Sequence, residues 1–195
     1  MKQFYTLIFS LVMTTLSFGH VIITEIADPV DNTDARFVEI YNIGTTGFDL
    51  TGYYLGRWTN DSPTPTASTK VSLTSIGTLG AGQFAIIAAN ETAFTTAFGM
   101  TPDVNASGGP ADSNGDDQIA IFNASDAIVD LFGVPGEDGN TPVVTCHEFE
   151  DGRAVHPQTV SLLPGDSIYF RELAPLTEDL LTHHLQSLPA GWVRQ

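Results

Sequence analysis

The sequence has one cysteine in 195 residues, few cationic side chains and no apolar run of membrane-spanning length. Cys146 has no second cysteine to pair with, so internal disulfide bonds are excluded. We expect its thiol to be buried rather than bonded to another chain. A chain of this length suits one domain and can bury a sufficient core without cross-links.

Cationic residues are scarce, because 7 Lys and Arg stand against 23 Asp and Glu, for a net charge of −16. Nearly all of this excess lies before Arg153. A surface this negative repels phosphate backbones and anionic lipids, which disfavours nucleic acid and membrane surfaces as partners. It suits solubility in salt or the attraction of cations, and solvation alone is the simpler interpretation.

The motifs of common catalytic sites are also missing. The sequence contains no G-x-S-x-G nucleophile elbow, no H-E-x-x-H zinc motif and no glycine-rich phosphate loop. The common hydrolase and nucleotide-binding signatures are therefore absent.

The first 19 residues have the order of a secretory signal. Lys2 precedes an apolar run from about Phe4 to Leu16, and small residues follow at Ser17 and Gly19. The run is shorter than the ~20 residues that a membrane-spanning helix requires. We therefore expect residues 1–19 to be removed, a mature chain that begins near His20, and a location outside the cell or at its surface. An uncleaved anchor is the alternative.

After the signal, short runs rich in β-branched and aromatic residues alternate with turn residues, which is typical of strands. The expected strands cover residues 21–26, 37–41, 53–58, 70–73, 83–88, 118–123 and 128–133. One short helix is expected over Glu91–Phe98, where Phe94 and Phe98 share a face and Gly99 ends the helix. This spacing predicts an all-β fold, an antiparallel sandwich with one short helix.

A series of motifs follows in a fixed order: ITEIADP, ARFVEIYN, DLTGYYLGRWTN, LGAGQFAIIAAN, SNGDDQIAIFNASDAIVDLFG, GEDG and HEFEDGRA. Together they resemble the lamin-tail domain of exported microbial proteins, over roughly residues 21–154. The resemblance implies an immunoglobulin-like β-sandwich over residues 20–154. It serves as an interaction tail in nuclear lamins and as an accessory module, often beside hydrolase domains, in secreted microbial proteins. No catalytic residue set is known for the family, so we expect a non-catalytic binding module for an extracellular protein or a polysaccharide.

Residues 155–195 depart from the family pattern, because they lose the acidic bias and gain leucine and histidine. The leucines fall on one helical stripe, which predicts a C-terminal amphipathic helix docked on the sandwich: Leu176, Leu180, Leu181, Leu185 and Leu188. An altered reading frame near the end of the gene is the alternative explanation. We also expect too little chain here for an enzyme domain.

The loop DSNGDD is the main candidate for metal binding. Asp112, Asn114 and Asp116 place oxygen ligands at alternate positions, as a calcium loop does. The EF-hand pattern is incomplete, because Asp117 stands where glycine is required and Asn123 where glutamate is required. The alternative is a turn whose aspartates accept backbone N–H groups.

A second and weaker calcium candidate is the group of loop acids between the first two expected strands, Asp28, Asp31 and Asp34.

Two enzyme hypotheses also follow from the sequence. Glu25 and Glu39 lie on neighbouring expected strands and would suit the carboxylate pair of a glycosidase if they shared a face. We favour a solvated strand face, or ion pairs of these glutamates with Arg36 or Arg57.

Cleavage after Gly19 would expose the amine and imidazole of His20. Joined by a second histidine such as His147, they would resemble the copper brace of lytic polysaccharide monooxygenases. The lamin-tail resemblance instead makes His20 the incidental residue before the first strand.

Overall fold

The structure, a computed structural model, describes residues 20–138 and 149–155. The expected signal over residues 1–19, Cys146, His147 and the expected helix over residues 176–188 lie outside the described residues. No helix within the described ranges is long and apolar enough to cross a bilayer.

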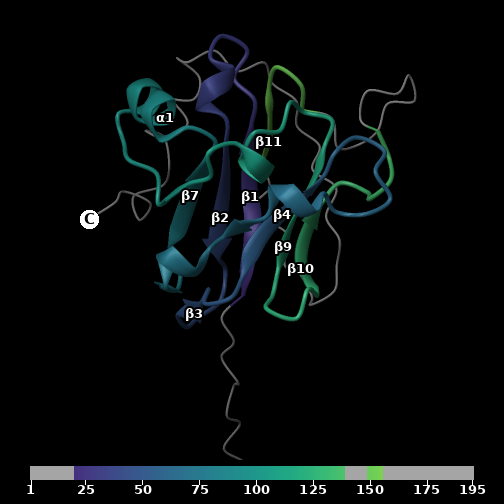
Figure 1. Cartoon of the computed structure of the whole chain (residues 1–195). Coiled ribbons are helices and arrows are strands. Elements are labelled where there is room, and N and C mark those ends of the chain that lie inside the picture. Colours follow the sequence, from purple (N-terminus) through teal and green to yellow (C-terminus); the bar gives the residue numbers. More distant parts are fainter. Residues whose placement is uncertain (1–19, 139–148, 156–195) are drawn as a thin grey trace, which may run out of the picture.

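One sheet has five strands in the order β11-β1-β2-β7-β8 (Figure 1). Its pairs are antiparallel except for β7 and β8. The strands are β1 (Val21–Ala27), β2 (Phe37–Asn42), β7 (Phe84–Ala88), β8 (Val104–Asn105) and β11 (Arg153–Val155).

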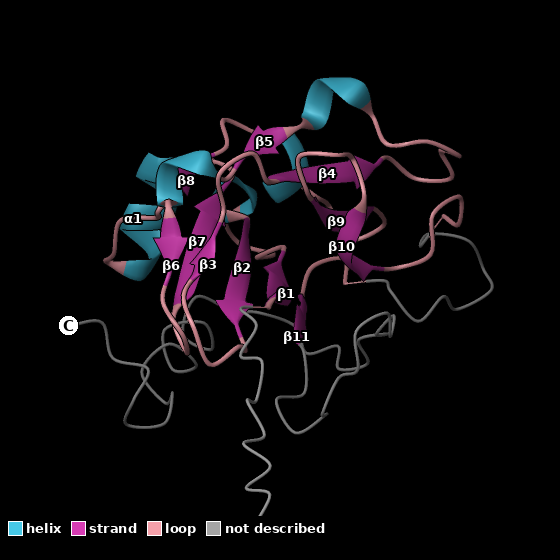
Figure 2. Cartoon of the chain, turned by 90° about the horizontal axis from the view of Figure 1, so that it is seen from below, coloured by secondary structure: helices cyan, strands magenta, loops and turns pink. Residues whose placement is uncertain are grey.

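The second sheet has four strands in the order β10-β9-β4-β5, and a two-stranded ribbon pairs β3 with β6 (Figure 2). These strands are β3 (Phe48–Asp49), β4 (Tyr54–Trp58), β5 (Val71–Ser72), β6 (Thr78–Leu79), β9 (Gln118–Phe122) and β10 (Ile128–Phe132). Single turns of 3-10 helix lie in the loops, at η1 (Thr33–Ala35), η2 (Ala67–Thr69), η3 (Thr74–Ile76) and η4 (Gly109–Ala111).

The core lies between the two sheets. Alternate residues of a strand point to one face, so the inward positions of both sheets meet there. Representative members of this buried cluster are Ile23, Val38, Ile40, Ile87, Leu55, Ile119, Ile121 and Phe132. The prediction of an immunoglobulin-like antiparallel β-sandwich is confirmed.

Helix α1 (Glu91–Phe98) covers part of the outer face of the five-stranded sheet (Figure 1). The Asn90 side chain caps the helix by accepting from the Ala93 amide at 3.1 Å, and Gly99 ends it in the left-handed conformation. The rings of Phe94 and Phe98 lie 5.4 and 5.6 Å from the Phe37 ring, edge to face. The predicted helix and its aromatic face are confirmed.

The loops gather at two ends of the sandwich. The β1–β2 loop, helix α1 and the turn before β11 lie at one end, and β3 and the β9–β10 hairpin lie at the other (Figure 1). Loops on a rigid sandwich are where such folds carry binding residues, so both ends and both outer sheet faces are places to look for a site.

Candidate functional site

Strand β1 contains a bulge that brings two of its side chains against one residue of β2. Ile23 pairs with Ile40 and Glu25 pairs with Glu39, with a register shift between them, so Thr24 is the extra residue. The Ile23 amide donates to Asp130 Oδ2 on β10 at 2.7 Å, a contact between the two sheets. The bulge therefore places a glutamate opposite a glutamate.

Glu25 and Glu39 form a buried carboxylate pair. Directly opposite residues of an antiparallel pair share a face, with Cβ atoms about 5 Å apart. Glu25 is 2% exposed and Glu39 is 5% exposed. Thr24 Oγ1 donates to Glu39 Oε1 at 2.6 Å, and Arg153 Nη1 lies 3.4 Å from Glu25 Oε1.

The surroundings of the pair favour the protonated carboxyl. Burial raises the pKa of Glu25 to about 8; the Glu39 charge adds to this rise, and Arg153 opposes it. Burial also raises the pKa of Glu39, while the hydrogen bond from Thr24 opposes that rise. At neutral pH the arrangement holds a proton on Glu25.

The expectation of a solvated strand face for these glutamates is wrong, because packing buries both. The expected ion pairs are also wrong, since Arg36 and Arg57 bind aspartates instead. The two glutamates do share a face, as the glycosidase hypothesis required. Side chains so deeply buried nevertheless offer almost no surface to a polysaccharide.

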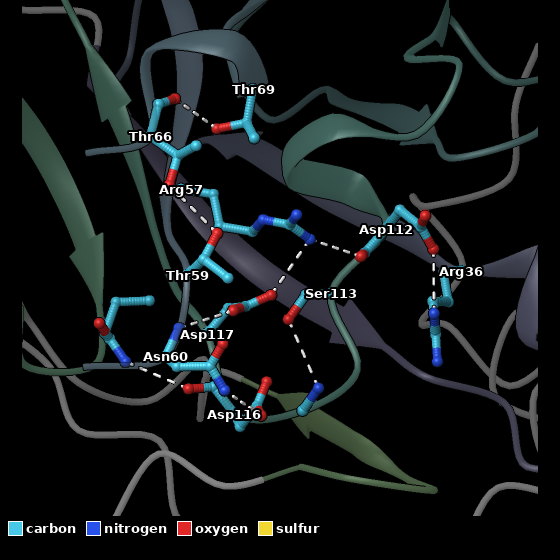
Figure 3. Close-up of polar contacts among 12 residues, drawn as sticks. Arg36, Arg57, Thr59, Asn60, Thr66, Thr69, Asp112, Ser113, Asp116 and Asp117 are labelled. Carbon is cyan, nitrogen blue, oxygen red and sulfur yellow. Dashed lines mark hydrogen bonds and ion pairs between the residues drawn. The ribbon is translucent and has the colours of Figure 1, made fainter. Parts of the chain in front are cut away.

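A second polar cluster joins the β4–β5 loop to the β8–β9 loop (Figure 3). Arg57 Nη1 lies 3.1 Å from Asp117 Oδ2 and donates to the Asp112 carbonyl at 2.6 Å. The Asn60 backbone N–H donates to Asp117 Oδ1 at 3.1 Å. Burial raises the pKa of Asp117, and the Arg57 guanidinium opposes the rise. The cluster holds two loops in fixed positions.

The three predicted calcium ligands all lie in the β8–β9 loop, but they face different partners. Asp112 Oδ1 accepts from Arg36 Nη1 at 3.0 Å, and Asp116 Oδ2 accepts from Asn60 Nδ2 at 2.9 Å. Asn114 is exposed. Within residues 20–138 and 149–155, no group of three or more His, Cys, Asp or Glu side chains is arranged to hold a metal ion. Calcium binding here stays a prediction.

The residues of the weaker calcium candidate, Asp28, Asp31 and Asp34, differ in solvent exposure. Asp28 is 2% exposed, and its Oδ1 lies 2.6 Å from Arg36 Nε. Asp31 and Asp34 are exposed on the same loop. Arg36 thus bridges Asp28 and Asp112 and joins the β1–β2 loop to the β8–β9 loop.

His20 precedes β1 directly, and its backbone nitrogen donates to Asn42 Oδ1 at 3.2 Å. That nitrogen would be the amine of a copper brace. The second expected ligand, His147, lies outside the described residues. The copper hypothesis stays a prediction.

Aromatic rings line the outer face of the four-stranded sheet. Tyr54 and Phe122 pair across β4 and β9 and stack with centroids 5.0 Å apart, and Trp58 lies 5.6 Å from Phe122. Gly56 permits this, because a Cβ there would meet the Phe122 ring at 2.7 Å. Lys70 Nζ lies 4.3 Å from the Tyr54 ring centroid.

Three members of these clusters did not stand out in the sequence, namely Thr24, Asn60 and Arg153. Each is significant only through a contact across strands or loops, and no local motif marks such a contact. Arg153 lies in the HEFEDGRA motif, but its pairing with Glu25 depends on the β1–β11 register.

Comparison with protein families gives one match. A family model described as Lamin Tail Domain matches residues 14–136, which is more than half of the chain. The search of curated proteins found no match.

Proposed function

The chain belongs to the lamin tail domain family, and from this membership we propose that it is an exported, non-catalytic binding module. Immunoglobulin-like domains of this family are generally non-catalytic. We propose further that its partner is an extracellular protein with a cationic surface, recognised by the loops at the α1 end of the sandwich.

The distribution of charge carries this proposal. Every Lys and Arg in the described ranges already pairs with a carboxylate: Arg36, Arg57, Lys70 and Arg153. Six exposed acids lie in the β1–β2 loop, in the β4–β5 loop, in the first turn of α1 and just before β11: Asp31, Asp34, Asp61, Glu91, Glu150 and Asp151. Complementary charge steers association and selects partners.

The internal contacts supply the rigidity that a recognition surface needs. Arg36 and Arg57 bind carboxylates of the β8–β9 loop from the β1–β2 loop and from β4. Binding through loops held in place costs less conformational entropy than binding through loops that must first be ordered. The acidic end is therefore built as a fixed surface.

The test uses two variants with the same change in charge. Asp31→Asn/Asp34→Asn removes two acids from the α1 end, and Asp49→Asn/Asp126→Asn removes two from the opposite end. Affinity for a lysine- and arginine-rich peptide is measured for each by calorimetry at physiological salt. We expect the first variant to bind several-fold more weakly and the second to match the wild type. Equal weakening in both would show general attraction to a negative chain and would contradict an end-specific surface.

Export is tested separately. The chain expressed in a secreting host should appear in the medium, and its first residue should be His20 by N-terminal sequencing. Retention in the cell with residues 1–19 intact would contradict this part of the proposal.

A further inference from the structure

The outer face of the five-stranded sheet carries titratable groups that the proposed binding function does not use. Phe37, Glu39 and Tyr41 alternate along β2 and so share a face, and Phe37 packs against α1 on that outer face. Glu25 of β1 lies opposite Glu39 of β2. Arg153 of the neighbouring strand β11 lies opposite Ala27 of β1. The face therefore brings together groups from β1, β2 and β11.

The charges of this group do not balance when every member is ionised. Two carboxylates, Glu25 and Glu39, face one guanidinium, Arg153, and both carboxylates are almost fully buried. Tyr41 lies on the same face of β2, and Asp130 approaches β1 from β10 at the Ile23 amide. A buried charge without a partner is costly, whereas one proton on the carboxylate pair makes the three groups neutral.

Strand β11 is the element that depends most on this balance. It is three residues long, and its register with β1 consists of three residue pairs. Arg153 is the one charged residue of Arg153–Val155, and it is the cation that faces Glu25 and Glu39. Detachment of β11 would remove that cation and admit water to Glu25. A short strand at the edge of a sheet is also the kind of element that opens locally before the rest of the fold.

We propose that Glu25 and Glu39 share one proton and act as a pH-sensitive latch, which holds β11 tightest at acidic pH and loosens it towards alkaline pH. The raised pKa of Glu25 supports this direction. A carboxyl whose pKa is higher when buried than in water binds its proton more tightly in the closed state. Closure is therefore favoured fully below the pKa of the exposed carboxyl, near 4.5, and the advantage is lost as pH rises to about 8.

The first test is a carboxyl ¹³C NMR titration of the full chain between pH 3.5 and 9.5. In the wild type one glutamate should titrate near pH 8, and that signal should be absent from Glu25→Gln. In Glu39→Gln the Glu25 midpoint should fall, because Glu39 is already charged when Glu25 titrates. Midpoints near 4.5 for both residues, or a Glu25 midpoint unmoved by Glu39→Gln, would overturn the shared proton.

The second test follows the latch by hydrogen exchange of the β11 amides, corrected for the intrinsic pH dependence of exchange. Their protection should fall by up to about tenfold per pH unit between pH 5 and 8 and then level off. Protection of β7 should stay constant. Glu25→Gln should remove the pH dependence, and the exposed control Asp126→Asn should retain it. Constant β11 protection in the wild type, or an unchanged slope in Glu25→Gln, would overturn the proposal. If Glu25→Gln does not fold, the Glu25 midpoint in Glu39→Gln still decides the matter.

Discussion

Glu25 lies directly opposite Glu39 on the neighbouring strand, and the β1 bulge at Thr24 places both carboxyls on one buried face. Like charges opposite one another destabilise a sheet, and burial adds to the cost. The fold tolerates the pair because the pKa of Glu25 is raised to about 8, which keeps that carboxyl neutral at physiological pH.

Replacing Glu25 by glutamine should stabilise the protein, and by an amount that grows with pH. The unfolded glutamate ionises above its ordinary pKa of 4.5, while the folded one keeps its proton up to about pH 8. The wild type therefore loses stability over that window, by at most about 1.4 kcal/mol per pH unit, and Glu25→Gln does not. Urea denaturation at pH 4.5, 6 and 8 measures this. An equal difference between the two proteins at all three pH values would contradict the raised pKa.

The β-sandwich could be predicted from the sequence because its long strands and its helix carry their signals locally. The apolar runs of β1, β2, β7 and β9, the shared face of Phe94 and Phe98, and the Gly99 stop are all visible without a structure. The short strands were missed, since β3, β6 and β8 have two residues and β11 has three. Runs of that length have no periodicity, and only pairing with a neighbour defines them.

The candidate site was less predictable, because its contacts depend on register and loop packing. The acidic residues were visible, but their partners were not. A one-residue bulge in β1 decides that Glu25 faces Glu39, and the fold of three loops decides that Arg36 and Arg57 bind aspartates. Alternation alone cannot assign strand faces at the bulge, where the period of two is interrupted.

Replacing Asp117 by asparagine should destabilise the fold by roughly 3 kcal/mol, because the Arg57 guanidinium would lose its carboxylate partner. The Asp117 side chain is 2% exposed, and that of Arg57 is 17% exposed. The control is Asp126→Asn, which removes the exposed ion pair with Lys70 and should leave the midpoint of denaturation unchanged. Equal effects of the two changes would mean that burial does not strengthen the Arg57 contact.

Replacing Gly115 by alanine should be far more damaging than replacing Gly77 by alanine. Both glycines have positive φ, +101° and +69°. A Cβ at Gly115 would lie 2.1 Å from the Glu150 nitrogen, whereas a Cβ at Gly77 meets nothing within 4 Å. Gly77→Ala should therefore cost only the backbone strain of about 1 kcal/mol, and Gly115→Ala should also separate the β8–β9 loop from the turn before β11. Thermal denaturation of the two variants distinguishes strain from collision, and similar melting temperatures would contradict the close approach.

Calcium should bind the β8–β9 loop weakly if Asp112, Asn114 and Asp116 are its ligands. The ion would compete with Arg36 for Asp112 and with Asn60 for Asp116, so we expect a dissociation constant of about 1 mM, as in weak extracellular modules. At ~10 mM calcium such a site stabilises the folded state by about 1.4 kcal/mol, which a thermal melt detects. Asn114→Ala removes the exposed ligand and leaves the Arg36 and Asn60 contacts in place. It should abolish the shift, while Asn32→Ala in the β1–β2 loop should keep it. A shift that survives Asn114→Ala, or that sodium chloride of equal ionic strength reproduces, would contradict a calcium site formed by Asp112, Asn114 and Asp116.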